Sequence, residues 1–227
     1  MIKNLNLKQY QPNFAKKYAQ GKGWSEVIIP NLLTLLPEKI DRMKLLDLGC
    51  GTGDLLFELK KAGKACEYTG IDLSKSMLKV ARINNPEYKF ICADVTEFSK
   101  KVSIKFDLII SIMVFCVLDT KEKLVSAFKE ISSVLTKEGK AFIVVPHPIS
   151  DPYIQSMSVS DYLNDGKSYN VVKKLENGED LKFTDVHWSL SAYINSALNG
   201  GLKVGQIKEL SPIKSNLPTY LLIELKK

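Results

Sequence analysis

Short apolar runs alternate along this chain with segments in which apolar residues recur at helical spacing. This alternation is typical of a parallel sheet whose two faces are both covered by helices. It predicts an α/β fold with a doubly wound, mostly parallel sheet. The five expected strands are Lys44–Leu48, Glu67–Ile71, Lys89–Cys92, Phe106–Ser111 and Ala141–Val145.

The segments between the first three runs carry helix signals. After the first run, Leu55, Leu56 and Leu59 fall on one helical face, and the helix is expected to stop near Gly63 because glycine commonly follows a helix end. Ser74 is expected to cap the next helix, since a serine oxygen can accept from the first free backbone amides. The apolar face of that second helix comprises Met77, Leu78 and Ala81.

A longer helix is expected after the fourth run. Asp119 and Glu122 have capping-box spacing, with aspartate in place of the usual Ser or Thr. The helix is expected to end at Gly139. Its buried positions are expected to be Leu124, Phe128, Ile131 and Leu135.

The pattern changes after Val145. The segment PHPISDPY has three prolines in eight residues, which predicts an irregular loop. Asn177-Gly178 lies between the strand-like runs Tyr169–Lys174 and Leu181–Val186, and Asn-Gly in that position is a strong hairpin signal.

Both ends of the chain add further elements. A helix over Leu190–Asn199 is expected to stop at the following glycine pair, with strands near Lys203–Glu209 and Thr219–Leu225 after it. At the amino terminus, Phe14–Leu36 is apolar and helical in pattern, and we expect it to lie as a cap over the sheet.

Composition narrows the class of protein. The chain has 227 residues, of which 45% are hydrophobic and 25% charged, as in ordinary globular domains. The longest apolar stretch, Leu108–Leu118, is interrupted by Ser111 and is much shorter than the ~20 residues that cross a bilayer. The amino terminus lacks the apolar core of a secretory signal, so we expect a cytoplasmic protein without membrane association.

The cysteines and the charge add two more expectations. The four cysteines never approach C-x-x-C spacing, so we expect buried thiols and no metal site. The net charge of +7 raises the question of nucleic acid. However, the lysines are scattered and the only arginines are Arg42 and Arg82, which favours a solvated surface over a nucleic-acid groove.

A glycine-rich turn follows the first expected strand, in the segment LLDLGCGTGDLL. A nucleoside triphosphate loop would need the G-x-x-x-x-G-K-[ST] pattern, which is absent here. A dinucleotide loop would need a third glycine where Asp54 stands, and a carboxylate at a helix amino terminus repels a pyrophosphate. Neither phosphate-binding pattern therefore fits.

The motif Asp47-Leu48-Gly49-Cys50-Gly51-Thr52-Gly53 resembles the acid-x-G-x-G-x-G motif of class I S-adenosylmethionine-dependent methyltransferases. The resemblance spans residues 44–227 and implies a seven-stranded sheet whose last strand is antiparallel. It also implies a cofactor site for S-adenosylmethionine, with S-adenosylhomocysteine as the product. The implied cofactor-binding residues are Asp47, Gly49, Cys50, Gly51, Gly53, Asp72, Leu73, Met77, Asp94, Val95 and Ser111.

Two acids after later strands carry this resemblance further. It implies that Asp72 accepts hydrogen bonds from the ribose hydroxyls, and that Asp94 accepts from the adenine amino group beside the Val95 amide. The resemblance also implies that the end of the fourth strand, near Ser111, passes beneath the methionine portion of the cofactor. Taken singly, Asp72 could instead cap the following helix, and Asp94 could form a turn.

The acceptor side is defined less sharply. His147 is the candidate general base, because histidine titrates near neutral pH, although between two prolines it could equally be a structural hydrogen-bonding residue. His187, Trp188 and Tyr18 are further candidates for substrate contact. Cys116 lies in an apolar run without an adjacent base and is expected to be packed.

These expectations define a single methyltransferase domain over residues 1–227, with residues 1–43 as a helical cap and residues 150–188 as a substrate-side hairpin insert. The expected reaction is methyl transfer to a small organic molecule, by a monomer or homodimer. Two alternatives stay open: an RNA or protein methyltransferase, and a non-catalytic partner subunit that binds the cofactor. A nicotinamide-dependent dehydrogenase is disfavoured by Asp54.

Overall fold

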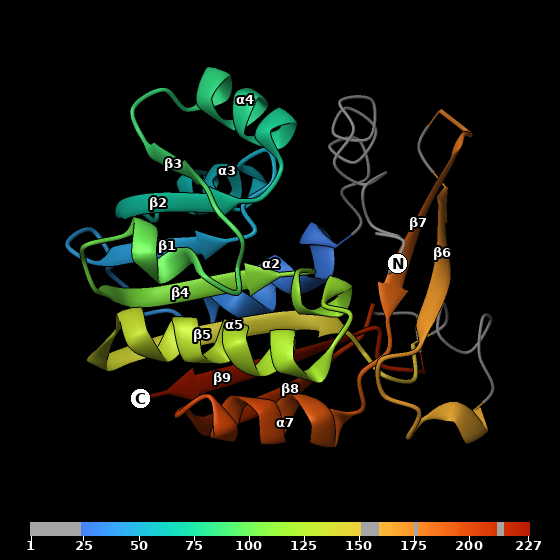
Figure 1. Ribbon diagram of the computed structural model, residues 1–227. Coiled ribbons are helices and arrows are strands. Elements are labelled where there is room, and N and C mark those ends of the chain that lie inside the picture. Colours follow the sequence, from blue (N-terminus) through green and yellow to red (C-terminus); the bar gives the residue numbers. More distant parts are fainter. Residues whose placement is uncertain (1–23, 151–158, 175–176, 213–215) are drawn as a thin grey trace.

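The computed structural model describes residues 24–150, 159–174, 177–212 and 216–227. Seven strands form one sheet in the order β3-β2-β1-β4-β5-β9-β8, and β6 and β7 form a separate hairpin (Figure 1). The strands of the main sheet are β1 Lys44–Leu48, β2 Glu67–Asp72, β3 Lys89–Cys92, β4 Phe106–Ile112, β5 Leu135–Pro146, β8 Lys203–Leu210 and β9 Tyr220–Lys226.

The strand directions match the expected class. β1 pairs in parallel with β2 and β4, while β9 is antiparallel to both of its neighbours, β5 and β8. Six strands therefore run one way and the last runs the other way. The expectation of a doubly wound, mostly parallel seven-stranded sheet is confirmed.

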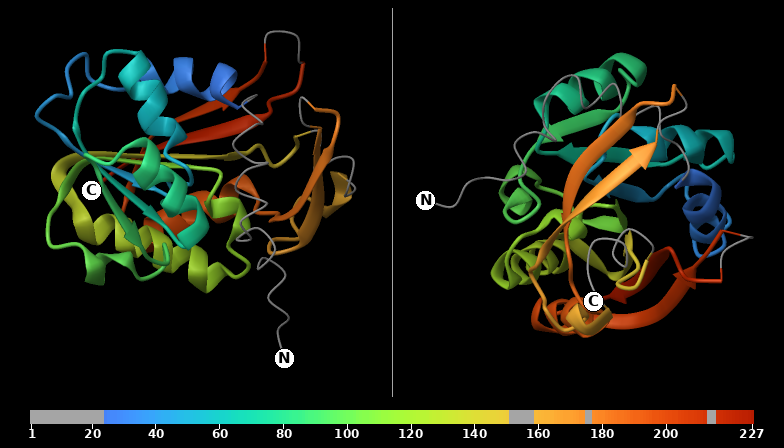
Figure 2. Two further views of the ribbon diagram at one scale, coloured as in Figure 1. Left: turned by 90° about the horizontal axis from the view of Figure 1, so that it is seen from above. Right: turned by 90° about the vertical axis from the view of Figure 1, so that its right-hand side faces the viewer.

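Helices cover both faces of the sheet. Apolar side chains of α2, α3 and α4 pack with Leu45 and Phe142 on one face, and those of α5 and α7 pack with Leu46 and Ile143 on the other. Figure 2 shows α2 and α3 on the side opposite α5. These helices are α2 Ser25–Leu33, α3 Asp54–Lys61, α4 Lys75–Asn84, α5 Lys121–Val134 and α7 Leu190–Asn199. The described residues also form the short 3₁₀ turns η2 Phe98–Lys101, η3 Phe115–Val117 and η4 Val159–Asp161.

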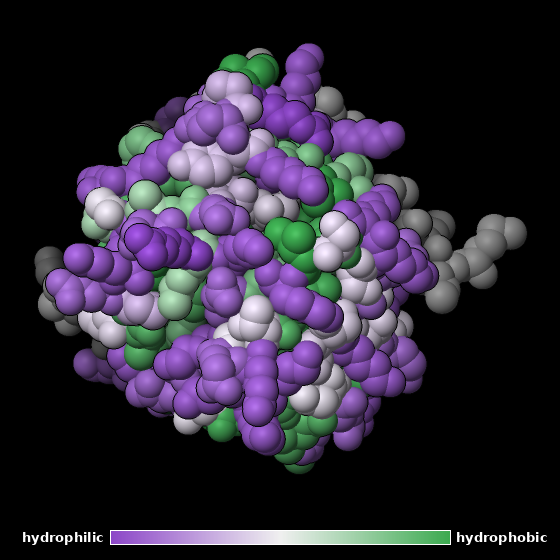
Figure 3. Space-filling view, turned by 90° about the vertical axis from the view of Figure 1, so that its left-hand side faces the viewer, coloured by the Kyte–Doolittle hydropathy of each residue, from purple (hydrophilic) through white to green (hydrophobic). Residues whose placement is uncertain are grey.

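The hairpin is where the Asn-Gly signal places it. β6 Ser168–Lys174 pairs antiparallel with β7 Asp180–Val186, and Gly178 has φ 81° in the turn. The hairpin stands beside the edge of the main sheet toward which the arrows of β1 and β4 point (Figure 1). In open α/β sheets, ligands bind at this carboxyl edge. The side of the molecule that lies away from the hairpin carries mostly hydrophilic side chains, with smaller hydrophobic areas between them (Figure 3).

The expected start of α5 is wrong by one residue. Thr120 is the N-cap, in an extended conformation, and its side-chain oxygen accepts a hydrogen bond from the Lys123 backbone N–H. Asp119 instead accepts from the Lys123 ammonium at 2.6 Å on the surface. Thr120 satisfies an amide at the helix end, which an ion pair one residue earlier does not do.

The expected end of α5 is also wrong. The helix stops at Val134, because Leu135 is already extended and begins β5. Leu135 is buried as expected, but from a strand that pairs with Phe106. The register then shifts before Lys140, and Gly139 lies in this irregular stretch, where a Cβ would come within 2.8 Å of the Thr136 hydroxyl oxygen.

The Thr120 cap gives a first prediction. Thr120→Ala is expected to lower the free energy of unfolding by about 1 kcal/mol, because one helix-end amide loses its partner. Asp119→Ala, one residue away, is the matched control and is expected to cost less than about 0.5 kcal/mol, because its ion pair is exposed. Urea denaturation of both variants measures these differences. Equal losses would contradict the assignment of the cap.

Part of the amino-terminal expectation lies outside the described residues. Of the segment 14–36, the structure describes α2 and the turn after it, with Ile28 and Leu32 fully buried under the sheet. Tyr18 lies outside the described part of the chain. None of the helices described has the length and hydrophobicity needed to cross a bilayer.

Candidate active site

The turn between β1 and α3 has an unusual backbone. Gly49, Gly51 and Gly53 have φ values of 83°, 53° and 87°, in the left-handed region that glycine adopts most readily. The amides of Gly49 and Cys50 both donate to the Ile71 carbonyl, at 2.7 and 2.9 Å. These bonds hold the turn over the end of β2.

The first two glycines of this turn differ in their surroundings. A Cβ at Gly49 would lie 2.1 Å from Cγ2 of Val114, so the turn is packed closely against the segment after β4. A Cβ at Gly51 would meet no atom within 4 Å. The backbone at Gly51 therefore faces open space, where a ligand can approach the main chain.

Asp72, at the end of β2, ties this turn to α4. Its two carboxylate oxygens accept hydrogen bonds from the Gly51 amide at 2.9 Å and from the Ser74 amide at 2.7 Å. Ser74 is the N-cap of α4, as expected, and accepts from the Met77 amide. Burial raises the pKa of Asp72, against the lowering effect of these amide bonds. An ionised carboxylate has about four acceptor positions, so Asp72 can still accept from hydroxyl groups.

The edge formed by β2 and β3 combines polar and apolar groups. Asp94 Oδ1 accepts from the Thr96 amide and hydroxyl, at 2.9 and 2.7 Å, so it does form a turn. Leu73 has 46% of its surface exposed, while Met77 and Val95 are buried. An exposed leucine near two strand-end carboxylates is a suitable environment for a planar base whose rim carries polar groups.

Asp47 lies below the glycine turn rather than on its surface. It is buried, and the Tyr68 hydroxyl donates to its carboxylate at 2.6 Å. Burial raises the pKa of Asp47 to about 7, and the charges of Asp72 and Asp54 act in the same direction, while the bond from Tyr68 opposes them. The carboxyl groups of Asp47, Asp54 and Asp72 therefore lie close enough together around the turn to interact electrostatically.

Two other implied cofactor residues are deeply buried. Cys50 has 6% of its surface exposed, and burial raises the pKa of its thiol far above the ordinary value. Ser111 is fully buried, and its hydroxyl donates to the Leu48 carbonyl at 2.8 Å. Ser111 therefore joins the ends of β4 and β1 beneath the turn.

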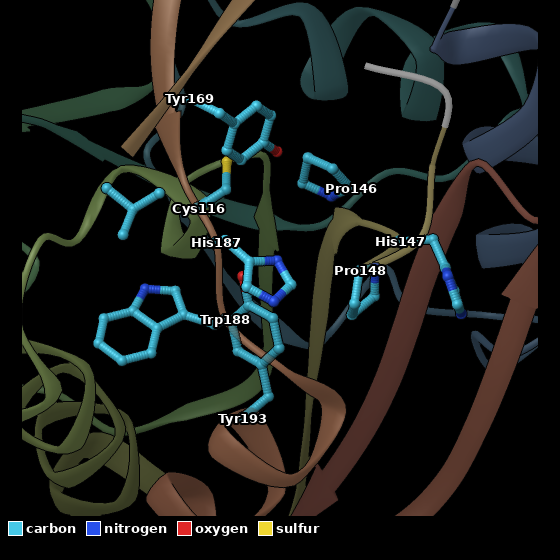
Figure 4. Close-up of a pocket in the computed structure, with 9 residues that line it drawn as sticks. Cys116, Pro146, His147, Pro148, Tyr169, His187, Trp188 and Tyr193 are labelled. Atoms are coloured by element: carbon cyan, nitrogen blue, oxygen red, sulfur yellow. The ribbon is translucent and has the colours of Figure 1, made fainter. Parts of the chain in front are cut away.

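A small hollow of about 10 Å³ lies between the hairpin, η3 and α7. In Figure 4 the ring of His187 lies next to that of Tyr193, Tyr169 lies beside Cys116, and the ring of His147 points away from these side chains. The residues that line this acceptor-side pocket are Cys116, Pro146, His147, Pro148, Tyr169, Val186, His187, Trp188 and Tyr193.

The candidates for substrate contact have structural partners. His147 Nε2 lies 3.1 Å from a carboxylate oxygen of Glu209, and its Nδ1 accepts from the Ile149 amide. His187 Nε2 donates to the Tyr162 carbonyl, and burial lowers its pKa. The Trp188 indole donates to the Leu118 carbonyl at 2.9 Å. A catalytic role for His147 stays a prediction.

The structure adds a residue that the sequence interpretation did not single out. Asp185 of β7 is only 2% exposed and accepts a hydrogen bond from the Cys116 thiol. Its signal in the sequence is strand alternation, which places an acid on the same face as Leu181 and Phe183. Among the described residues, no group of three or more His, Cys, Asp or Glu is arranged to hold a metal ion.

The doubly wound sheet, the glycine turn after β1 and the acids at the ends of β2 and β3 are arranged as in α/β domains that bind nucleoside cofactors. The chain matches the family model described as methyltransferase domain over residues 39–186. It belongs to that family. The resemblance drawn from the glycine motif is thereby confirmed at the level of family and fold.

The matches to individual relatives cover different shares of those proteins' lengths. The biotin biosynthesis bifunctional protein BioHC of Cellvibrio japonicus is 28% identical over 131 residues, which are 57% of this chain and 25% of BioHC. The malonyl-acyl-carrier-protein O-methyltransferase of Bacillus cytotoxicus is 24% identical over 230 residues, which are 97% of this chain and 80% of that protein. The chain thus spans only a quarter of the length of BioHC.

Solved structures share the fold over nearly the whole chain. The structure of an S-adenosylmethionine-dependent methyltransferase from Clostridium acetobutylicum matches with a TM-score of 0.66 at 18% sequence identity. The match covers 94% of this chain and 97% of that one. At this identity the likeness concerns the fold. It extends beyond residues 39–186 to the elements at both ends of the chain.

Proposed function

We propose that the protein transfers a methyl group from S-adenosylmethionine to a small organic molecule. The observation that carries this proposal is the acid-lined glycine turn, where Asp47, Asp54 and Asp72 surround a backbone that opens to solvent at Gly51. S-adenosylmethionine carries a sulfonium and an ammonium group, which these carboxylates attract, whereas a phosphate would be repelled.

The residues present fit this cofactor. The backbone of residues 49–53 would hold its methionine end, Asp72 its ribose hydroxyls, and Asp94 with the Val95 amide its adenine edge. Leu73 and Met77 would pack against the base, while Cys50 and Ser111 support the turn from below. When bound, the cofactor supplies a methyl group activated by a positively charged sulfur.

The protein's share in this reaction is mainly positioning. Holding an acceptor in line with the methyl group and excluding water lowers the barrier without covalent chemistry by the chain. The acceptor-side pocket follows the ends of β4 and β5, at the same edge of the sheet as the glycine turn. His147, His187 and Trp188 remain candidates for contact with the acceptor, as does Tyr18. We also propose a cytoplasmic location and action without nucleic acid.

Calorimetric titration tests the proposal. S-adenosylmethionine and S-adenosylhomocysteine are both expected to bind, whereas nicotinamide adenine dinucleotide is not. Asp72→Asn is expected to weaken S-adenosylmethionine binding about 10- to 100-fold, because hydrogen bonds to a charged group contribute roughly 1.5–3 kcal/mol.

The matched control is Asp41→Asn, which removes an exposed carboxylate before β1 and is expected to leave the affinity unchanged. A thermal melt confirms that both variants are folded. Absence of binding by either cofactor form, or tight binding of the dinucleotide, would contradict the proposal.

A further inference from the structure

Tyr68 brings a hydroxyl group into the core behind the glycine turn. It lies on β2, in register with Leu45 of β1, and its side chain is buried. Its ring meets those of Tyr88 and Phe90 edge to face, with centroids 5.7 and 6.0 Å apart. The hydroxyl donates to Oδ2 of Asp47 at 2.6 Å, a distance typical of a hydroxyl bonded to an ionised carboxylate. Packing of the ring thus fixes the direction from which Asp47 receives this bond.

The bond from Tyr68 leaves the second carboxylate oxygen of Asp47 available. In the part of the chain that the structure describes, no hydrogen bond joins Oδ1 of Asp47 to another group. Nor is this oxygen fully enclosed, because the enclosed side-chain oxygens without a partner among these residues are those of Ser150 and Ser196. The Asp47 carboxylate therefore has one oxygen held from behind and one that a ligand or water can reach.

The charges around Asp47 come from the turn and from the elements on either side of it. Asp72 at the end of β2 and Asp54 at the start of α3 both act on it. The Cys50 thiol in the turn also lies within its electrostatic reach, and Arg82 of α4 is the cation that acts on that thiol. The groups that act directly on Asp47 are therefore acids, which disfavour its charge.

The Tyr68 hydroxyl is the neighbour that favours the ionised form of Asp47. Burial raises the pKa of Asp47 to about 7, and the hydrogen bond from Tyr68 opposes this increase. A donor that faces a carboxylate stabilises its charged form. Burial raises the pKa of Tyr68 itself well above its ordinary value, so the phenol keeps its proton and remains a donor. Without this hydroxyl, Asp47 would be protonated over more of the neutral range and would attract a cation less.

Asp47 is also close in the chain to the proposed site of the cofactor's methionine end. It belongs to β1 and lies two residues before Gly49, where the glycine turn begins. Resting on the proposed function, we propose that Tyr68 is a positioning residue for the cofactor. Its hydroxyl holds Asp47 as an oriented, ionised carboxylate, whose free oxygen attracts the positively charged methionine end of S-adenosylmethionine. Tyr68 acts through Asp47 and does not itself touch the cofactor.

This arrangement links cofactor binding to a proton. A cation binds the ionised form of Asp47 more tightly than the protonated form, so binding favours release of the Asp47 proton to water. Removing the Tyr68 hydroxyl makes that release harder. The cost to binding is therefore greatest at a pH where Asp47 is protonated before the cofactor binds.

Tyr68→Phe removes the hydroxyl and keeps the ring. Calorimetric titration of the full-length protein with S-adenosylmethionine is expected to show about tenfold weaker binding at pH 6, because a hydrogen bond to a charged group shifts an equilibrium roughly tenfold or more. At pH 8.5 the loss is expected to shrink to about threefold or less, because Asp47 is then mostly ionised in both proteins. The ammonium group of the ligand titrates equally in both titrations and cancels in the ratio.

Two controls separate positioning from a general structural role. 5′-Methylthioadenosine lacks the charged methionine end, so Tyr68→Phe is expected to leave its affinity within about twofold. Tyr88→Phe makes the same chemical change on the ring that packs against Tyr68 and is expected to alter neither affinity.

A double substitution tests whether the hydroxyl acts through Asp47. In an Asp47→Asn background there is no carboxylate charge to stabilise. Adding Tyr68→Phe to that background is therefore expected to change S-adenosylmethionine affinity less than about twofold at pH 6. A loss of about tenfold that persists there would overturn the proposal.

Nuclear magnetic resonance of the unaltered protein decides the question even if Tyr68→Phe does not fold. With tyrosine labelled with carbon-13 at Cζ, the Tyr68 signal is assigned through its own ring protons. It is expected to shift with pH around a midpoint near 7, as the acid bonded to it ionises. Saturation with S-adenosylmethionine is expected to lower that midpoint by about one pH unit or more.

The two proposals fail in different ways. If S-adenosylmethionine binds but Tyr68→Phe weakens it equally at every pH, or weakens 5′-methylthioadenosine as much, the Tyr68 proposal is wrong and the proposed function stands. A Tyr68 signal that responds to neither pH nor cofactor also overturns it. If the unaltered protein does not bind S-adenosylmethionine, the proposed function fails first.

Discussion

Gly49→Ala is expected to lower the free energy of unfolding by about 3 kcal/mol and to abolish S-adenosylmethionine binding. Two costs add. Gly49 has φ 83°, and placing an L-residue in the left-handed region costs roughly 1–2 kcal/mol. The new Cβ would also lie 2.1 Å from Val114 Cγ2, and overpacking of this kind costs roughly 1–3 kcal/mol. The turn cannot shift away from Val114 without breaking the hydrogen bond from the Gly49 amide to the Ile71 carbonyl.

Gly63→Ala is the matched control for this experiment. Gly63 also has positive φ, 69°, but a Cβ there would meet no atom within 4 Å, and it lies after α3, away from the turn. It is expected to lose only about 1 kcal/mol and to bind the cofactor normally. Denaturation and calorimetric titration measure both quantities. Val114→Ala in the Gly49→Ala background is expected to recover part of the stability, and equal losses for the two alanine variants would rule out the clash.

The cofactor edge of this fold could be predicted from the sequence because its signals are local. The glycine turn, Asp72 and Asp94 each directly follow an apolar run, and parallel strands bring their carboxyl ends to one edge. Ser74 likewise lies at the start of its own helix. In each of these cases the partner groups are near in the chain, or their placement follows from the sheet alone.

The details that could not be predicted depend on distant pairing. Gly139 has the sequence signature of a helix end, but pairing of Leu135 with Phe106 begins the strand four residues earlier. Asp185 and Cys116 are far apart in the chain, and they meet only because the hairpin folds back over η3. Periodicity could place an acid on an apolar face, but it could not identify the group opposite.

The same distinction bears on the choice of a general base. Residue type alone favours His147, yet the structure pairs its ring with Glu209 on the edge strand β8, and Figure 4 shows it turned from the other pocket side chains. Asp185 shows the same influence of its surroundings, because burial raises the pKa of its carboxyl group to about 7. The tertiary surroundings of a side chain therefore say more about its protonation and its partners than its residue type does.

The stability of the protein is expected to fall as pH rises from about 4 to 7, through Asp47 and Asp185. Both carboxyl groups have a pKa near 7 in the folded state and the ordinary value of 3.8 when exposed. Between these values the folded chain keeps a proton that the unfolded chain has lost. Raising the pH therefore favours unfolding, by about 1.4 kcal/mol per pH unit and group. Over three units this amounts to on the order of 4 kcal/mol for each acid.

The difference between a variant and the unaltered protein cancels the contribution of every titrating group that does not interact with the replaced carboxyl group. Asp185→Asn is expected to gain stability relative to the unaltered protein as pH rises from 4 to 7, and to gain no more above 7, because asparagine never becomes charged. Asp47→Asn is expected to behave alike, since its side-chain oxygen can still accept from the Tyr68 hydroxyl. Asp41→Asn controls for net charge. Urea denaturation across this range measures the differences, and a constant difference for Asp185→Asn would mean that its carboxyl group reaches solvent in the folded protein.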